Sequence, residues 1–232
     1  MNLHTIAGLT LLALGACAST PPSVPQPEAL RYDAAMAEFA DADARAMPPE
    51  CGFLFVGSSS IRFWRTLKDD FPDRSVINRG FGGSTVAEVN WYFDRAVEPY
   101  KPQAIIFYAG ENDLNAGKTP EQVLSDFELF MRLKDHALGS TPVWYISAKP
   151  SKLRINQLPV QADLNARIEA LADRRDDLAY IDIASAMLNP DGTPKDIFVA
   201  DDLHMTPDGY AIWTPIVDAA LDAGQKARAP GC

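Results

Sequence analysis

The sequence predicts an α/β fold in which a five-stranded parallel sheet carries helices on both faces. Short apolar runs alternate with helical segments along the chain, and this alternation is typical of parallel sheets. The run 53–56 ends abruptly in Gly57 and three serines. Periodicity alone does not separate a buried strand from a buried helix, but the shortness of the run, its aromatic and β-branched residues and the glycine favour a covered strand. A length of 232 residues suits one such domain.

The first expected element is a peripheral helix over 28–46. Leu, Met and Ala recur there at helical spacing until Pro48 and Pro49 stop the helix. The expected strands are short apolar runs, and the run 104–109 is the clearest of them. In chain order the strands are expected at 53–56, 76–78, 104–109, 143–147 and 179–183.

A helix is expected after each strand. Thr119 is an N-cap candidate and Pro120 suits the first helical position, so a long helix begins there. The last helix begins near Thr206 and Pro207. In chain order these helices are expected at about 60–68, 86–97, from 120 onward, 156–173 and 207–223.

The composition excludes several function classes. The formal net charge is -10, which argues against a nucleic-acid partner and against electrostatic docking on anionic lipid. The Gly-rich segment 80–83 lacks the third glycine of a dinucleotide-binding fingerprint, and no Walker motif occurs. The only histidines are His4, His136 and His204, so a His-rich zinc site is not expected. No metal or organic cofactor is implied.

The N-terminus is expected to be a targeting segment rather than part of the fold. An apolar run at 6–14 is too short to span a bilayer but fits a signal-peptide core. Small residues and then Cys17 follow it, which resembles a bacterial lipobox, although 1–5 lacks Lys and Arg. We therefore expect a lipoprotein signal at 1–16, a lipidated Cys17 with a Pro-rich tether to residue 27, and the folded domain at 28–232. A plain secretory signal is the alternative. In both cases the protein is exported to the cell envelope, and the lipoprotein would face the periplasm.

Two further cysteines, Cys51 and Cys232, could pair in an oxidising compartment. Such a bridge would tie the C-terminal tail to the start of the first strand. Two free thiols are the alternative, because the sequence does not reveal the geometry that a disulfide needs.

Four expected strand or loop ends carry polar or glycine residues suited to chemistry. Ser59 follows the first strand, Gly83 follows the second, Asn112 follows the third, and Asp201 and His204 precede the last helix. Open α/β sheets bind their ligands at the carboxyl ends of the strands. These residues are therefore expected on one rim of the sheet.

Acyl transfer needs this set of groups. A serine hydroxyl is a weak nucleophile until a base takes its proton, and His204 is suited to be that base. Asp201, three residues earlier, can orient the imidazole, with Asp202 as the rival. The backbone N–H groups of Ser59 and Gly83 and the Asn112 amide could stabilise an oxyanion.

These residues resemble the SGNH hydrolases, also called GDSL-type esterases and lipases, in an exported bacterial form. The resemblance runs from about 53 to 210 and rests on four blocks in the family's order. The blocks are Gly57-Ser58-Ser59-Ser60, the segment from Asn78 through Gly83, Gly110-Glu111-Asn112-Asp113, and Asp201-Asp202-Leu203-His204. It implies a three-layer α/β/α sandwich of flavodoxin-like type and serine-dependent hydrolysis of esters or thioesters.

One departure concerns the residue before the nucleophile, where the family usually has Asp and this chain has Ser58. Alignment of Gly57 selects Ser59 as the nucleophile, with Ser58 or Ser60 as alternatives. Asp113 is expected to bond within its own loop, and Lys149 and Arg154 are expected in a solvated loop on the active rim.

The expected function is hydrolysis of acyl esters, on short acyl chains or on O-acyl groups of carbohydrates, because the loops after the strands are short. A lysophospholipase-like or thioesterase-like activity is the enzymatic alternative. A non-catalytic, carbohydrate-binding envelope lipoprotein with the same fold is the alternative from another class, and Ser58 motivates it.

Overall fold

The structure is a computed structural model that describes residues 20–27, 30–224 and 227–232. The expected signal segment and Cys17 lie outside the described residues. Residues 20–27 have no regular secondary structure. Among the described residues, no helix is long and apolar enough to cross a membrane.

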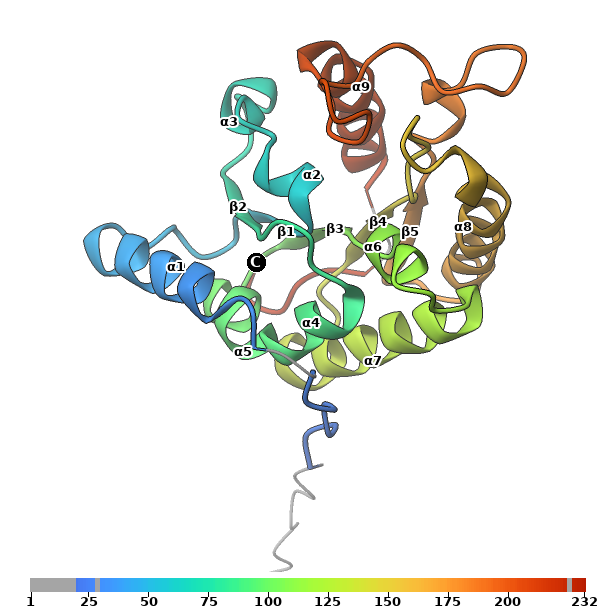
Figure 1. Ribbon diagram of the computed structural model, residues 1–232. Coiled ribbons are helices and arrows are strands. Elements are labelled where there is room, and N and C mark those ends of the chain that lie inside the picture. The colour runs from blue at the N-terminus through green and yellow to red at the C-terminus, as the bar shows by residue number, and fades with distance from the viewer. Residues whose placement is uncertain (1–19, 28–29, 225–226) are drawn as a thin grey trace, which may run out of the picture.

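A five-stranded parallel sheet forms the centre of the molecule, which confirms the predicted fold class (Figure 1). Its strands run in the order β2-β1-β3-β4-β5 and pair in parallel. The chain moves from β1 outward to β2 and then returns to β3 on the other side of β1, so the strand order reverses beside β1. The strands are β1 (Phe53–Gly57), β2 (Val76–Gly80), β3 (Ala104–Tyr108), β4 (Val143–Ile146) and β5 (Leu178–Ile181).

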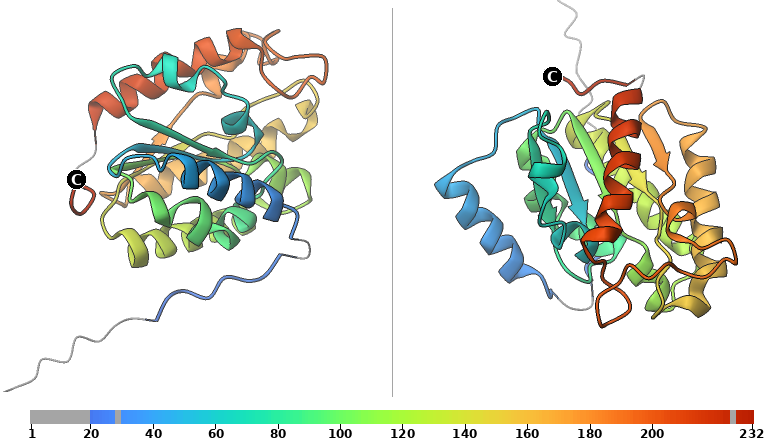
Figure 2. Two further views of the ribbon diagram at one scale, coloured as in Figure 1. Left: turned by 90° about the vertical axis from the view of Figure 1, so that its left-hand side faces the viewer. Right: turned by 90° about the horizontal axis from the view of Figure 1, so that it is seen from above.

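Two helical layers cover the sheet (Figure 2). One layer contains α2 (Ser59–Arg62), α3 (Leu67–Asp70) and α9 (Pro207–Ala223), and its core is aromatic, with Phe55, Trp64 and Trp213 fully buried. Residues of the other layer share a second core with Val56, Phe107 and Phe127. That layer contains α1 (Asp33–Arg45), α4 (Val86–Trp91), α5 (Phe93–Ala96), α7 (Pro120–Leu138) and α8 (Leu158–Ala172).

Two expected helices are interrupted. The helix expected at 60–68 is divided into α2 and α3, because Trp64 Nε1 and Thr66 Oγ1 donate hydrogen bonds to the Asp70 carboxylate at 2.6 and 2.8 Å and close a turn. The helix expected at 86–97 is divided into α4 and α5 at Tyr92. Short elements that the sequence did not indicate are α6 (Glu111–Asn115), η1 (Glu98–Tyr100), η2 (Ile155–Gln157) and η3 (Ser185–Met187).

Helix α7 begins as expected. The Thr119 side chain accepts a hydrogen bond from the Gln122 N–H at 3.3 Å, and the Gln122 side chain accepts one from the Thr119 N–H at 2.9 Å. This reciprocal capping satisfies two backbone donors that a helix start leaves without intrahelical partners.

Cys51 and Cys232 are joined by a disulfide across a sequence separation of 181 residues. Of the two possibilities that the sequence left open, the structure therefore contains the bridge. It fastens the C-terminal end of the chain beside the residue that leads into β1.

Candidate active site

The turn between β1 and α2 presents Ser59. Gly57 has φ +131°, and a Cβ at this position would lie 1.9 Å from the Tyr108 carbonyl oxygen of β3, so only glycine fits there. The next N–H, that of Ser58, donates to the same oxygen at 2.9 Å. Ser58 and Ser60 are only 2% and 3% exposed, whereas Ser59 is partly exposed. Of the three serines, Ser59 is the one that a substrate can reach.

The glycine loop after β2 approaches Ser59, because a Cβ placed on Gly82 would lie 3.8 Å from the Ser59 Cβ. The N–H groups of Ser59 and Gly83 have no hydrogen-bond acceptor within the part of the chain that the structure describes. Gly83 has φ +82°, a conformation that L residues with side chains rarely adopt. Both N–H groups are therefore available to a bound oxyanion.

The Asn112 amide is held from both ends. Its Nδ2 donates to the Ser84 carbonyl oxygen at 3.0 Å, and its Oδ1 accepts from Arg154 Nη2 at 2.9 Å. Since the amide nitrogen carries two hydrogens, one remains for a ligand. The bond to Ser84 also ties the loop after β3 to the Gly83 loop after β2.

Asp113 strengthens this link between loops and does not bond only within its own loop, as the sequence had suggested. Its carboxylate accepts from the Val86 N–H, the first of α4, at 3.0 and 3.2 Å. The same carboxylate lies 3.5 Å from Lys118 Nζ. Burial raises the pKa of Asp113 to about 6, although Lys118 and the Val86 N–H oppose this shift.

His204 and Asp201 form a hydrogen-bonded pair in one turn. His204 Nδ1 lies 2.5 Å from Asp201 Oδ2, and Asp201 Oδ1 accepts from the N–H groups of Leu203 and His204 at 2.9 Å each. Partial burial of Asp201 acts to raise its pKa, but these hydrogen bonds outweigh it and lower the pKa to about 2. Asp202, the rival for this role, is exposed and has no hydrogen bond to His204 among the described residues.

Two contacts hold the His204 turn against the Ser59 helix. The Phe63 ring, which directly follows α2, meets the imidazole edge-on with 4.9 Å between ring centroids. The Tyr210 hydroxyl of α9 donates to the Ser60 carbonyl oxygen at 2.9 Å. Ser59 and His204 share no hydrogen bond in the described chain, and such bonds are often long before a substrate binds.

A buried charged cluster lies beneath these residues, and sequence reasoning missed it. Glu111, Lys149 and Arg154 are 4%, 1% and 8% exposed, so Lys149 and Arg154 do not lie in a solvated loop as expected. Glu111 Oε1 lies 3.0 Å from Arg154 Nη1, and its Oε2 lies 3.2 Å from Lys149 Nζ. Burial lowers the pKa of Lys149, against the opposing effect of Glu111.

The cluster contacts both Asn112, the candidate oxyanion donor, and the turn before His204, the candidate base. Arg154 donates to Asn112, and Lys149 Nζ donates to the carbonyl oxygen of Leu203, the residue before His204, at 2.8 Å. Glu111 thus connects the candidate oxyanion donor to the candidate base. The position of Glu111 directly after the third strand was the one sequence signal for it. Among the described residues, no His, Cys, Asp and Glu side chains cluster so as to hold a metal ion.

This sheet, with a serine after its first strand and an Asp–His pair before its last helix, defines the class of α/β acyl hydrolases. The chain belongs to the GDSL-like lipase/acylhydrolase family, whose model matches residues 52–212. That assignment confirms the resemblance to the SGNH or GDSL-type hydrolases, and the exported bacterial form stays a prediction.

Individual relatives agree with the family. The chain is 30% identical over 173 residues to platelet-activating factor acetylhydrolase IB subunit alpha2 of Rattus norvegicus, covering 68% of this chain and 70% of that one. The Gallus gallus protein of the same name is 28% identical over 166 residues, with the same shares covered.

Solved structures share the fold. A GDSL-like lipase from Bacteroides thetaiotaomicron superposes with a TM-score of 0.69 at 21% identity, covering 81% of this chain and 97% of that one. A carbohydrate esterase of family 3 from Talaromyces cellulolyticus superposes with a TM-score of 0.61 at 14% identity, covering 74% and 96%.

Proposed function

We propose that this protein is a serine esterase that hydrolyses short acyl esters through Ser59, His204 and Asp201. The observation that carries the proposal is the 2.5 Å contact between His204 Nδ1 and Asp201. The His204 ring packs against Phe63, the residue after the short helix that begins with the accessible Ser59. Because Nδ1 is bonded to the carboxylate, Nε2 is the ring nitrogen left to accept the serine proton.

The reaction proceeds in two halves. Ser59 Oγ attacks the acyl carbonyl carbon while its proton passes to His204 Nε2, and the alcohol leaves with that proton. Water then attacks the acyl-enzyme, His204 takes a proton from this water, and the carboxylic acid and the free serine are released. Asp201 holds the imidazole in the required tautomer and stabilises its cationic form.

The oxyanion that forms in each half is stabilised by the N–H groups of Ser59 and Gly83 and by Asn112 Nδ2. Fixed donors of this kind act most strongly where charge develops in the transition state. The bond from Arg154 to Asn112 Oδ1 supports this assignment, because it fixes the amide orientation in which Nδ2 bonds Ser84 with one hydrogen and keeps the second hydrogen for the oxyanion.

The names of the relatives favour small acyl groups. A cavity of about 690 Å³ borders α4, α5 and α7, but its lining residues include none of the proposed catalytic residues. The names of the curated relatives specify an acetylhydrolase. We therefore propose acetyl and similarly short esters as substrates.

The test is hydrolysis of p-nitrophenyl esters of graded chain length by the wild type, Ser59→Ala and Ser75→Ala. Loss of the nucleophile should lower kcat by about 10⁶-fold on acetate and butyrate. Ser75→Ala is the matched control, because this exposed serine precedes β2 at the opposite end of the sheet. A wild-type protein that is inert on every ester and is not labelled by a fluorophosphonate would favour the carbohydrate-binding alternative.

We also propose that the protein is exported and carries lipid on Cys17, as the N-terminal sequence suggests. Radiolabelled palmitate should enter the wild-type protein in a bacterial host and be absent from Cys17→Ser. Incorporation that persists in Cys17→Ser would exclude this lipid site.

A further inference from the structure

The segment 62–68, which follows the proposed nucleophile, carries three cations without ion pairs. Many lysines and arginines of this acidic protein lie close to carboxylates, for example Arg31 near Glu88 and Lys101 near Glu50. Within the described chain, Arg62, Arg65 and Lys68 form no salt bridge, and all three are exposed. Of the two acids at the end of α3, Asp70 accepts hydrogen bonds from Trp64 and Thr66, and the exposed Asp69 forms no ion pair among the described residues.

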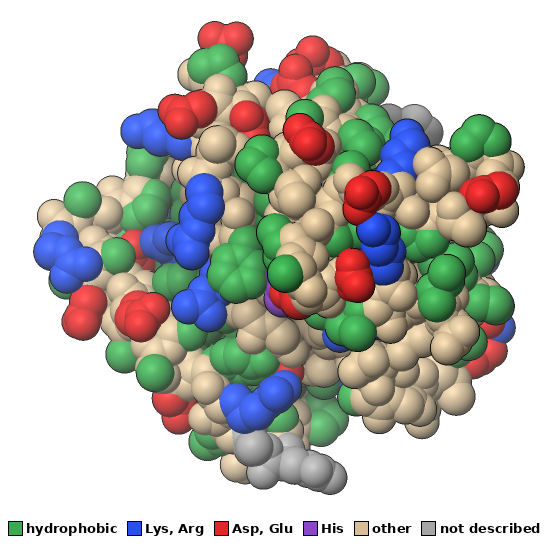
Figure 3. Space-filling model, turned by 45° about the horizontal axis from the view of Figure 1, so that its top comes forward, with side chains coloured by type: hydrophobic (Ala, Val, Ile, Leu, Met, Phe, Trp, Pro, Cys, Tyr) green, Lys and Arg blue, Asp and Glu red, His purple; other side chains and the backbone are tan. Residues whose placement is uncertain are grey.

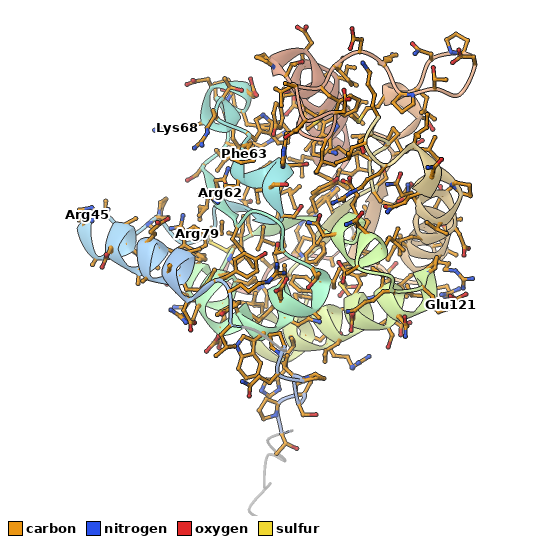
Figure 4. All side chains as sticks on the ribbon, in the orientation of Figure 1. Arg45, Arg62, Phe63, Lys68, Arg79 and Glu121 are labelled. Carbon is orange, nitrogen blue, oxygen red and sulfur yellow. A yellow bond between two sulfur atoms is a disulfide. The ribbon has the colours of Figure 1, made fainter. Side chains whose placement is uncertain are left out.

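These cations line one pocket. It has a volume of about 280 Å³, and Arg62, Arg65 and Lys68 form its wall together with Trp64, Leu67, Val76 and Asn78. Figure 4 shows Arg62, Phe63 and Lys68 on the α2–α3 side of the molecule, whereas Arg45 lies at the far end of α1. In Figure 3, lysine and arginine side chains gather on the face where a small area of histidine is exposed. A volume of this size accommodates one small charged group and no long acyl chain.

The pocket adjoins the proposed active site through Phe63. The guanidinium carbons of Arg62 and Arg65 lie 5.9 and 5.7 Å from the centroid of the Phe63 ring. The same ring contacts the His204 imidazole at 4.9 Å between centroids. Arg62 also approaches the oxyanion loop, since its Nη1 would lie 3.3 Å from a Cβ placed on Gly82. Arg62 and Arg65 are therefore separated from His204 by the Phe63 ring, and Lys68 is connected to them through the pocket that all three line.

We propose that Arg62, Arg65 and Lys68 bind an anionic group, a phosphate or a carboxylate, of the ester substrate. The inference rests on the proposed esterase function and specifies its substrate class as anionic esters. Guanidinium groups bind phosphate and carboxylate in a bidentate manner. Three neighbouring cations without ion pairs form a locally positive area on a protein whose net charge of -10 otherwise repels anions. Phe63 separates this group from His204 and so directs the ester bond toward Ser59.

A kinetic test compares phenyl acetate, which is neutral, with 4-acetoxybenzoate and 4-acetoxyphenyl phosphate. For each enzyme, kcat/KM on an anionic ester is divided by kcat/KM on phenyl acetate. In Arg62→Gln/Arg65→Gln/Lys68→Gln this ratio should be about tenfold or more below that of the wild type. The anionic ester that shows the larger fall identifies phosphate or carboxylate as the preferred group. The control Arg45→Gln/Arg132→Gln/Arg174→Gln removes the same charge from exposed positions outside the pocket. An equal ratio in both triple variants for both anionic esters would overturn the proposal.

A binding test separates this inference from the esterase function. Phenyl phosphate and benzoate are titrated into the wild type, Ser59→Ala and the pocket variant, and Kd is measured from NMR shifts. We expect wild type and Ser59→Ala to bind at least one of the two anions equally, and the pocket variant to bind it about tenfold more weakly or worse. If the wild type binds the anion but hydrolyses no ester, the anion pocket is supported and the esterase function is rejected. Equal binding by the wild type and the pocket variant would reject the pocket.

Discussion

At the residue scale, Asp201 combines two tasks within one turn. Its Oδ2 contacts the His204 ring, and its Oδ1 accepts two backbone N–H groups, which fix the carboxylate itself. The neighbouring Asp202 has φ +57° and no part in these bonds among the described residues. Adjacent residues of the same type therefore have different roles, which a pair of variants can separate.

Asp201→Asn should lower kcat on p-nitrophenyl acetate by about 10⁴-fold, because an amide in place of the carboxylate favours the wrong histidine tautomer. Asp202→Asn is the matched control, with the same charge change one residue away. It should keep kcat within about twofold, since Asn tolerates a left-handed backbone. Equal losses in the two variants would contradict the role given to Asp201.

Asp113 makes stability depend on pH in an unusual direction. Burial raises its pKa to about 6 in the folded protein, above the ordinary value of 3.8. Between these values the folded state binds the proton more tightly than the unfolded state, so this group stabilises the fold as the pH falls and destabilises it as the pH rises. At neutral pH both states are ionised, and the full cost of the buried carboxylate remains.

Asp113→Asn removes this titration. The free energy of unfolding of the variant minus that of the wild type should increase by about 2 kcal/mol from pH 4 to pH 7, because the unfolded carboxyl is already partly ionised at pH 4. Urea denaturation at several pH values measures this difference. Asp73→Asn, which changes an exposed carboxylate, is the control. A difference that is constant with pH would contradict the buried titration of Asp113.

At the scale of elements, the buried cluster joins three connections that follow strands. Glu111 begins α6, Lys149 and Arg154 follow β4, and their hydrogen bonds end on Asn112 and Leu203. A buried charge is costly unless it is paired, so the three side chains depend on one another. Their positions determine where the amide of Asn112 and the turn before His204 lie.

Arg154→Met should lower kcat on p-nitrophenyl acetate by about ten- to a hundredfold, less than the 10²–10³-fold typical of removing an oxyanion donor, because Asn112 remains but is no longer oriented. KM should change little. The assay is run well below the melting temperature, with the folded fraction measured by circular dichroism. Arg167→Met, which breaks partly exposed ion pairs on α8, is the control. An unchanged kcat in fully folded Arg154→Met would show that Asn112 needs no support.

At the scale of the whole molecule, the disulfide closes almost the entire described domain. Cys51 and Cys232 stand 181 residues apart in sequence, and the bridge between them restricts the unfolded chain as a whole. The sheet and every helix of both layers except α1 lie within this loop.

Cys51→Ser/Cys232→Ser should lose about 2–5 kcal/mol of stability in guanidinium denaturation. Dithiothreitol should destabilise the wild type by a similar amount and leave the double variant unchanged. Esterase activity at 25 °C should persist in the double variant, because neither cysteine contacts the proposed site. Equal stability of the wild type and the double variant would show that the bridge adds nothing to the fold.

Local patterns alone determined the strands, the start of α7 and the identity of the residues at the strand ends. Apart from β2, which contains Asn78 and Arg79, each strand is a short apolar run. Parallel strands place their carboxyl ends on one rim, so Ser59, Gly83 and Asn112 could be assigned to that rim from order alone. The capping of α7 by Thr119 could also be predicted from the sequence, because a cap depends on residues within one turn.

Tertiary structure alone decided which of three serines is accessible, where Lys149 and Arg154 lie, and that Arg62, Arg65 and Lys68 share one pocket. Tertiary structure also decided that Cys51 pairs with Cys232. Each of these features depends on contacts between segments far apart in sequence or on the local break between α2 and α3. Periodicity reports which face of a segment is apolar, whereas burial of a charge depends on the partners that packing brings to it.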